Sequence, residues 1–241
     1  MNTKKRLIML VMILISGISL SSVAAEEQSI ARSRANAIVK KDDGSHIDVP
    51  YHPINPEELI EIDEDEYPKT EGPLSINYVS AITFGSQEAT GEDTIFKSEL
   101  SRVIYQGKSL KVPNYVQVSD HRGSNSGWRL EVKQSDPFKN GVYELNGTEL
   151  KLSNTKLNSL SGDMTVAPKV VGDLSLSSND EYQLLIQADK DQGMGTWLIR
   201  FGEDNNEAPE SVTLFVPGKS KKVKGHYQTT LFWQLKDTPT E

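Results

Sequence analysis

The segment Ser153-Asn154-Thr155-Lys156 matches the Ser-x-x-Lys pattern of enzymes that form an acyl intermediate on serine. The partner motifs of those enzymes, Ser-Asp-Asn and Lys-Thr-Gly, do not accompany it, and the segment lies in a β-rich region instead of opening a helix. Gly218-Lys219-Ser220 lacks the earlier glycine of a phosphate-binding loop. The sequence also offers no pair of carboxylates at a spacing that suits sugar hydrolysis. We therefore expect a protein that is not an enzyme.

Metal chemistry has equally little support. The chain has no cysteine, which excludes disulfides, thiolate zinc sites, thiol nucleophiles and cysteine-ligated iron–sulfur clusters. Asp189, Asp191 and Gly193 match part of a calcium-binding turn without completing one. The histidines are scattered and form no pair with metal-binding helical spacing: His46, His52, His121 and His226. We predict no metal site and no cofactor.

The first 25 residues have the order of a secretory signal peptide. Lys4, Lys5 and Arg6 precede an apolar run from residue 7 to residue 15, and small residues lead up to Ala25. The run is too short for a comfortable membrane span of about 20 residues. We expect cleavage after Ala25, the alternative being an uncleaved anchor, and no membrane span in the mature chain. The predicted location is secreted and at the cell surface.

Residues 26–73 are predicted to form a disordered acidic spacer. They hold 13 acidic and 5 basic residues, and five prolines interrupt any regular element. A calcium site is the alternative for the acidic run between Glu57 and Glu66, but that run lacks the glycine turn of an ion-binding loop. The whole chain has a net charge of -8, which argues against a general nucleic-acid binder.

From residue 74 to residue 241 the chain consists of short alternating segments separated by turn residues, and no segment keeps a helical period for three turns. Asn146-Gly147 predicts a two-residue hairpin turn between neighbouring strands. The segments predict an all-β domain, an antiparallel β-sandwich of immunoglobulin-like or related topology. The main predicted strands are 78–84, 110–118, 128–132, 174–176, 182–188, 197–201, 212–216 and 227–235.

Two Trp-x-Leu triplets lie in these predicted strands. Alternate residues of a strand share a face, so Trp128 and Leu130 point to the same side, with Arg129 opposite. In the strand predicted for residues 227–235, Trp233 and Leu235 share a face in the same way.

These residues resemble the WxL domain, the carboxy-terminal wall-binding module of surface proteins in low-GC Gram-positive bacteria. That family has a first Trp-x-Leu after a Val-Gln-Val-x-Asp-x-Arg-Gly-like segment and a second one in a strand followed by proline. The resemblance covers residues 74–241 and leaves the predicted spacer unmatched. The matching pieces are 116–123, Trp128, Leu130, 193–197, 212–217, Tyr227, Thr230, Leu231, Trp233, Leu235 and Pro239.

The resemblance implies non-covalent attachment to the cell wall, with peptidoglycan as the partner and other surface proteins as companions. The alternative is an interaction subunit that binds a partner surface protein or a host matrix ligand. Indole faces stack on the C–H surfaces of sugar rings, so the candidate binding residues are Trp128, Leu130, Trp233 and Leu235. The same tryptophans could instead pin one sheet to the other inside the core, and both interpretations stay open.

A lysine cluster is the second candidate contact. Lys219, Lys221, Lys222 and Lys224 lie in a glycine-bounded segment before the predicted strand 227–235. Gram-positive walls carry polyanionic teichoic polymers, so the resemblance implies a contact between this cluster and their anionic groups. An exposed hairpin loop with no ligand is the alternative interpretation.

Overall fold

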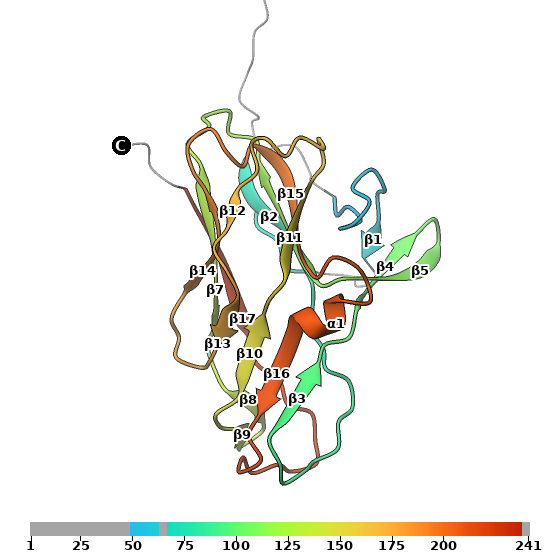
Figure 1. Ribbon diagram of the computed structural model, residues 1–241, viewed down its shortest axis with the longest axis vertical. Helices are drawn as coiled ribbons and strands as arrows, with labels where there is room; N and C mark the ends of the chain where they lie inside the picture. The colour runs from blue at the N-terminus through green and yellow to red at the C-terminus, as the bar shows by residue number, and fades with distance from the viewer. Residues whose placement is uncertain (1–48, 63–66, 238–241) are drawn as a thin grey trace, which may run out of the picture. The chain divides into compact units, whose positions relative to one another are not determined.

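The computed structural model describes residues 49–62 and 67–237, and almost all regular structure within them is β-strand (Figure 1). Strands account for 45% of the described residues and helices for 2%, and the strand pairs are antiparallel. The predicted all-β, antiparallel class is therefore confirmed. The predicted signal peptide and spacer residues 26–48 lie outside the described residues.

Three four-stranded sheets contain most of the strands. The first has the order β11 (Thr155–Ser159), β15 (Gly195–Phe201), β6 (Tyr115–Asp120) and β2 (Leu74–Val79). The second has the order β12 (Lys169–Val170), β14 (Gln183–Ala188), β7 (Trp128–Gln134) and β17 (Leu231–Asp237). The third has the order β13 (Leu174–Leu176), β10 (Glu149–Leu152), β16 (Val212–Val216) and β3 (Thr94–Lys97).

Two smaller sheets and one helical turn complete the described part of the chain. The three-stranded sheet has the order β1 (Glu61–Ile62), β4 (Ser101–Tyr105) and β5 (Lys108–Val112). A two-stranded sheet pairs β8 (Phe138–Asn140) with β9 (Tyr143–Leu145). The helix α1 (Ala208–Ser211) leads directly into β16.

All three four-stranded sheets contribute to one apolar core, whose largest fully buried side chains include Trp128, Trp197 and Phe201. In Figure 1, β7 and β14 lie on one side of this core and β15 and β11 on the other. The strands divide among three four-stranded sheets and not clearly into two layers. The all-β class is therefore confirmed, but the strands do not clearly form the two-layer sandwich that the sequence predicts.

Strand β6 is buried on both faces, because a second apolar cluster covers its other side. That cluster joins Tyr115 and Leu198 of the first sheet to Val103 and Val112 of the β4–β5 hairpin. The rings of Tyr78 and Tyr115 pack within it, with their centroids 4.6 Å apart. The first sheet is thus covered on both of its faces.

Residues 49–62, which we call the N-terminal strap, also cover the first sheet, and this corrects the spacer prediction for those residues. The Tyr51 N–H donates to Oε1 of the buried Gln117 at 2.9 Å, and Gln117 Nε2 donates to the Val49 carbonyl at 3.0 Å. Ile60 is buried, and β1 pairs with β4. Acidic composition did not prevent folding here because Glu57 and Glu61 stay exposed while Ile60 between them turns inward.

The predicted Asn146-Gly147 hairpin is wrong. Strand β9 before this turn pairs with β8, and β10 after it pairs with β13 and β16, so the turn carries the chain from one sheet to another. Gly147 has a φ of +77°, as the turn chemistry predicts, and the Thr148 hydroxyl closes the turn by donating to the Leu145 carbonyl at 3.1 Å. The local conformation was correctly predicted, but the strand partners were not.

Candidate functional site

The two Trp-x-Leu motifs lie side by side in the second sheet. Strands β7 and β17 pair in an antiparallel register that places Leu130 directly opposite Leu235. Residues opposite each other in such a pair share a face of the sheet, and so do residues two apart in one strand. Trp128, Leu130, Trp233 and Leu235 therefore all project from one face, and the middle residue of each triplet projects from the other.

Trp128 and Leu130 are completely buried in the core, with 0% of their surface exposed. The Trp128 Nε1–H donates to the Gly193 carbonyl at 2.9 Å, so the indole has its polar group satisfied inside the protein. An indole with no exposed face has no surface to stack on a sugar. Of the two interpretations left open by the sequence, the structure supports core packing for these two residues.

Trp233 and Leu235 pack against the same core but are only partly buried. Their strand, β17, is the edge strand of the second sheet, which leaves part of their surface open. The second motif thus closes the core at the sheet edge. The Trp and Leu side chains of both motifs therefore lie on the inner face of one sheet. The pairing of β7 with β17 brings these distant parts of the sequence together.

Arg122 links the two motifs. It forms a bidentate pair with Asp120, from Nε to Oδ1 at 2.9 Å and from Nη2 to Oδ2 at 2.7 Å. The same Nη2 donates to the Gly127 carbonyl at 2.7 Å, just before Trp128, and Nη1 forms an ion pair with Asp237 at the end of β17. The hydrogen bond with Asp120 is the main cause that raises the pKa of Arg122. The Asp-x-Arg sequence in residues 116–123 therefore has a structural role that sequence reasoning did not assign.

The opposite side of the second sheet, which we call the outer face, carries a row of side chains across three chain segments. Phe232 of β17 lies directly opposite Lys133 of β7, and Tyr182 immediately precedes β14 on the other side of β7. Phe232 is 46% exposed and Tyr182 is 40% exposed. The Lys133 Nζ lies 5.6 Å from the Phe232 ring centroid and 4.8 Å from that of Tyr182.

Polar side chains occupy the rest of the outer face. Lys236 forms an ion pair with Glu131 at 2.7 Å, and the Arg129 Nε–H donates to Gln187 Oε1 at 2.8 Å. Gln234 lies directly opposite Glu131. Arg129 and Gln234 are the middle residues of the two Trp-x-Leu triplets. The outer face therefore combines exposed aromatic rings with hydrogen-bonding groups, which is the composition of a binding surface.

Sequence reasoning missed the outer face as a site. The alternation of β17 places Phe232 opposite the tryptophan row, so the signal for Phe232 was present in the sequence. The position of Tyr182 depends on the pairing of β14 with β7, which alternation alone does not reveal.

The family model of the WxL domain, described as surface cell wall-binding, matches residues 26–239 of the chain. The chain belongs to the WxL family. Neither the curated proteins nor the solved structures contain a match to it. The WxL match begins well before residue 74, where sequence reasoning placed the start of the domain, and so includes the N-terminal strap.

Membership of the WxL family makes this chain a cell-wall-binding surface protein, and the family is a binding family and not an enzymatic one. Within residues 49–62 and 67–237, no helix is long and apolar enough to span a membrane.

The lysine cluster of this WxL protein divides into two kinds of side chain. The Lys222 ammonium donates to the carbonyls of Pro217 at 2.9 Å and Gly218 at 3.1 Å, so it holds its own loop together. Lys219, Lys221 and Lys224 are exposed, and the Lys221 Nζ lies 5.3 Å from the ring centroid of Tyr143. Three of the four predicted anion contacts are thus accessible, and Lys222 has a structural role.

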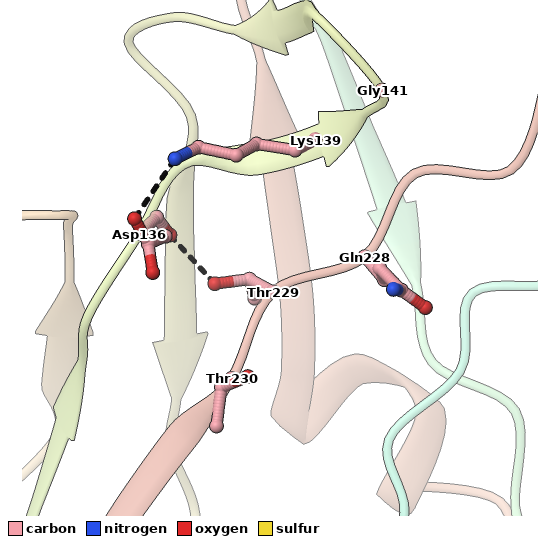
Figure 2. Close-up of a pocket in the computed structure, with 6 residues that line it drawn as sticks. All are labelled: Asp136, Lys139, Gly141, Gln228, Thr229 and Thr230. Carbon is pink, nitrogen blue, oxygen red and sulfur yellow. Dashed lines mark hydrogen bonds and ion pairs between the residues drawn. The ribbon is translucent and has the colours of Figure 1, made fainter.

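An open polar pocket of about 450 Å³ lies between the β8–β9 hairpin and the start of β17 (Figure 2). Asp136 and Lys139 form an ion pair at 2.9 Å on the hairpin side of it, and the hydrogen bond with Lys139 lowers the pKa of Asp136. The Thr229 hydroxyl donates to the Asp136 carbonyl at 2.6 Å. These contacts join the hairpin to the segment before β17 and include no nucleophile with an adjacent base. The lining residues are Asp136, Lys139, Gly141, Gln228, Thr229 and Thr230.

The other sequence candidates for chemistry have structural partners. The Ser153 hydroxyl donates to the Ser211 carbonyl at 3.0 Å, while Lys156 pairs with Glu203 at 3.4 Å. Asp189 pairs with Lys169 at 2.5 Å, and the hydrogen bond from Lys169 is the main cause that lowers its pKa. In the described part of the chain, no group of three or more potential ligands could hold a metal ion.

Proposed function

We propose that this protein is exported and attaches non-covalently to peptidoglycan through the outer face of its second sheet. The observation that carries the proposal is the pairing of β7 with β17, which directs the tryptophans and leucines of both motifs inward. A ligand that contacts this sheet flat-on must therefore meet the outer face. Export rests on the signal peptide expected in residues 1–25, with cleavage after Ala25.

We further propose that the exposed lysines Lys219, Lys221 and Lys224 contact anionic wall polymers. This contact is supported by the exposure of the three lysines and by their positive charge in a chain whose net charge is -8. Such a contact is screened by salt, whereas contacts on the outer face depend less on ionic strength.

For the architecture we retain the sandwich as a proposal, with the first and second sheets as its two layers around the common core. For partners, the proposal is peptidoglycan, with other surface proteins as additional companions.

The test is co-sedimentation of the full chain with intact walls, walls stripped of teichoic polymers and purified peptidoglycan. Charge reversal on the outer face, Arg129→Glu with Lys236→Glu, is expected to reduce sedimentation with all three. The matched control is Lys97→Glu with Lys151→Glu, because these lysines are similarly exposed on strands of the third sheet. It is expected to bind as the unchanged protein does.

A different outcome identifies the alternative function. If the unchanged protein does not sediment with purified peptidoglycan but brings down a surface protein from native envelopes, the peptidoglycan proposal is wrong and the interaction-subunit alternative gains support. Replacement of Lys219, Lys221 and Lys224 by alanine is expected to weaken binding to intact walls at low salt only. Equal loss on stripped walls would contradict the anionic-polymer contact.

A further inference from the structure

The row of Phe232, Lys133 and Tyr182 on the outer face has an arrangement suited to one kind of ligand. The lysine ammonium lies over both rings, within 5.6 Å of one centroid and 4.8 Å of the other, and this contact fixes the two rings on either side of it. Nearly half of the Phe232 surface remains open, and Tyr182 is similarly exposed. The two rings are therefore held in place and still available for contact.

The two lysines near this row are in ion pairs, and the nearby arginine is hydrogen-bonded to an amide. Lys133 binds Asp180 at 2.6 Å, Lys236 binds Glu131 at 2.7 Å, and Arg129 is held by Gln187. The carboxylates of Asp180 and Glu131 place negative charge beside the two lysines, and this charge repels a polyanion such as a teichoic chain. The amide of Gln234 lies in the next row along β17 and adds a neutral donor and acceptor.

A face with exposed rings, balanced charges and amide groups fits an uncharged chain of sugar rings. The C–H side of a pyranose is apolar and packs on an aromatic ring, while its hydroxyl and acetamido groups bond to amides and charged side chains. The stem peptides of peptidoglycan carry charged groups and no repeating flat apolar surface, so they match the two rings less well.

We propose that Phe232 and Tyr182 form a stacking site for the glycan strands of peptidoglycan, with Lys133 holding the rings and Gln234 bonding to the sugar substituents. This inference rests on the proposed function and goes beyond it, because it names the sugar backbone as the recognised part and assigns the stacking contact to two rings outside the Trp-x-Leu triplets.

The experiment uses the full chain and soluble glycan strands from which the stem peptides have been removed and whose freed lactyl carboxyl groups have been converted to amides, so that the strands are uncharged. The dissociation constant is measured by titration calorimetry. The test variant is Phe232→Leu with Tyr182→Leu, which keeps apolar bulk but removes both flat rings. Its affinity for the glycan is expected to fall at least about tenfold. Because both side chains are exposed, its far-UV circular dichroism is expected to match that of the unchanged protein.

Two further variants test whether binding depends on these two rings in particular. Tyr143→Leu is the matched control, because Tyr143 is also 38% exposed beside a lysine but belongs to the β8–β9 hairpin. It is expected to bind the glycan unchanged. Exchanging the rings, Phe232→Tyr with Tyr182→Phe, is expected to keep affinity within about threefold, because both rings can stack.

The outcomes separate this inference from the proposed function. If the unchanged protein binds whole peptidoglycan but not peptide-free glycan, or if the double leucine variant binds the glycan equally well, the stacking site is wrong and the proposed function stands. If the unchanged protein binds neither material, the proposed function fails and the stacking site fails with it.

Discussion

Leu130 and Leu235, one from each Trp-x-Leu motif, lie directly opposite each other across the antiparallel pair of β7 and β17. This register places both tryptophans on the inner face and the middle residues of both triplets on the outer face. The Trp and Leu of each triplet therefore pack inward, while the residue between them projects from the accessible face.

Replacement of Trp128 by alanine is expected to lower the free energy of unfolding by about 3–5 kcal/mol, because it removes a completely buried indole. Trp233→Ala is expected to cost only about 1–2 kcal/mol, because that side chain is partly exposed. Urea denaturation of the two variants checks the difference. Loss of wall binding by Trp128→Ala with unchanged stability would instead indicate direct ligand contact.

The tightness of packing around the Trp128 indole can be tested at two glycines with similar backbone conformations. Gly193 has a φ of +74°, and a Cβ there would lie 2.6 Å from Trp128 Nε1. Gly195 has a φ of +80°, but nothing lies within 4 Å of its Cβ position. Both alanine variants incur about 1–2 kcal/mol of backbone strain. Gly193→Ala is expected to lose about 1–3 kcal/mol more from overpacking, as measured by thermal unfolding.

Removal of the Arg122 guanidinium is expected to destabilise the protein by about 3 kcal/mol, because the Asp120 carboxylate is left buried without its cationic partner. Arg122→Lys keeps the charge but loses the bidentate geometry, so we expect it to restore only part of the stability. Hydrogen exchange of the β7 and β17 amides checks whether the two strands loosen together. Unchanged hydrogen-exchange protection in Arg122→Ala would show that Arg122 does not join the two strands.

A chain that begins at Leu74 is expected to be less stable than the chain that begins at Glu26, because it lacks the strap that covers Gln117 and contributes Ile60. Loss of the Ile60 side chain alone is expected to cost about 2–3 kcal/mol. The melting temperatures of the two chains measure this effect. Equal melting temperatures would show that the strap adds nothing to the fold.

The strap is expected to loosen in acid through His52. Burial lowers the pKa of His52 below 6.5, although Glu58 and Glu57 oppose the effect. The unfolded chain therefore takes up the proton first, so this contribution to stability is complete above about pH 6.5 and declines as the pH falls. Limited proteolysis at about pH 7.5 and about pH 5 should cleave the strap faster in acid.

Variants distinguish His52 from other groups in that experiment. The His52 Nδ1 accepts the N–H groups of Ile54 at 3.2 Å and Asn55 at 3.1 Å, and an asparagine oxygen can take the same place without titrating. His52→Asn is expected to remove the pH effect, while substitution of the exposed His226 by asparagine leaves it unchanged. Acid cleavage that persists in His52→Asn would assign the effect to another group.

Local alternation predicted many strands well. The ranges predicted for β13 and β16 match the structure, and β14 and β15 differ from their predictions by at most two residues. The predicted strand 110–118 is divided at Pro113 and Asn114, because the Asn114 side chain binds Ser101 and Ser98 and turns the chain into another sheet. This division depends on contacts that alternation does not encode.

The candidate site was only partly predictable for the same reason. Alternation correctly placed Trp128 with Leu130 and Trp233 with Leu235, but it did not reveal which face is buried. That depends on the pairing between β7 and β17 and on the sheets packed against them. The folded strap was hidden by its acidic side chains, which remain at the surface while a few apolar residues fix its position.

The pairing of β7 with β17 also affects the order in which the protein folds. The paired residues are separated by about a hundred positions in the sequence, so β7 emerges long before its partner during synthesis. Until β17 arrives, β7 presents an open edge and an unfinished apolar face, which is the state most exposed to aggregation. Chaperones that keep the chain unfolded should therefore matter most after β7 has been made and before β17 has been made.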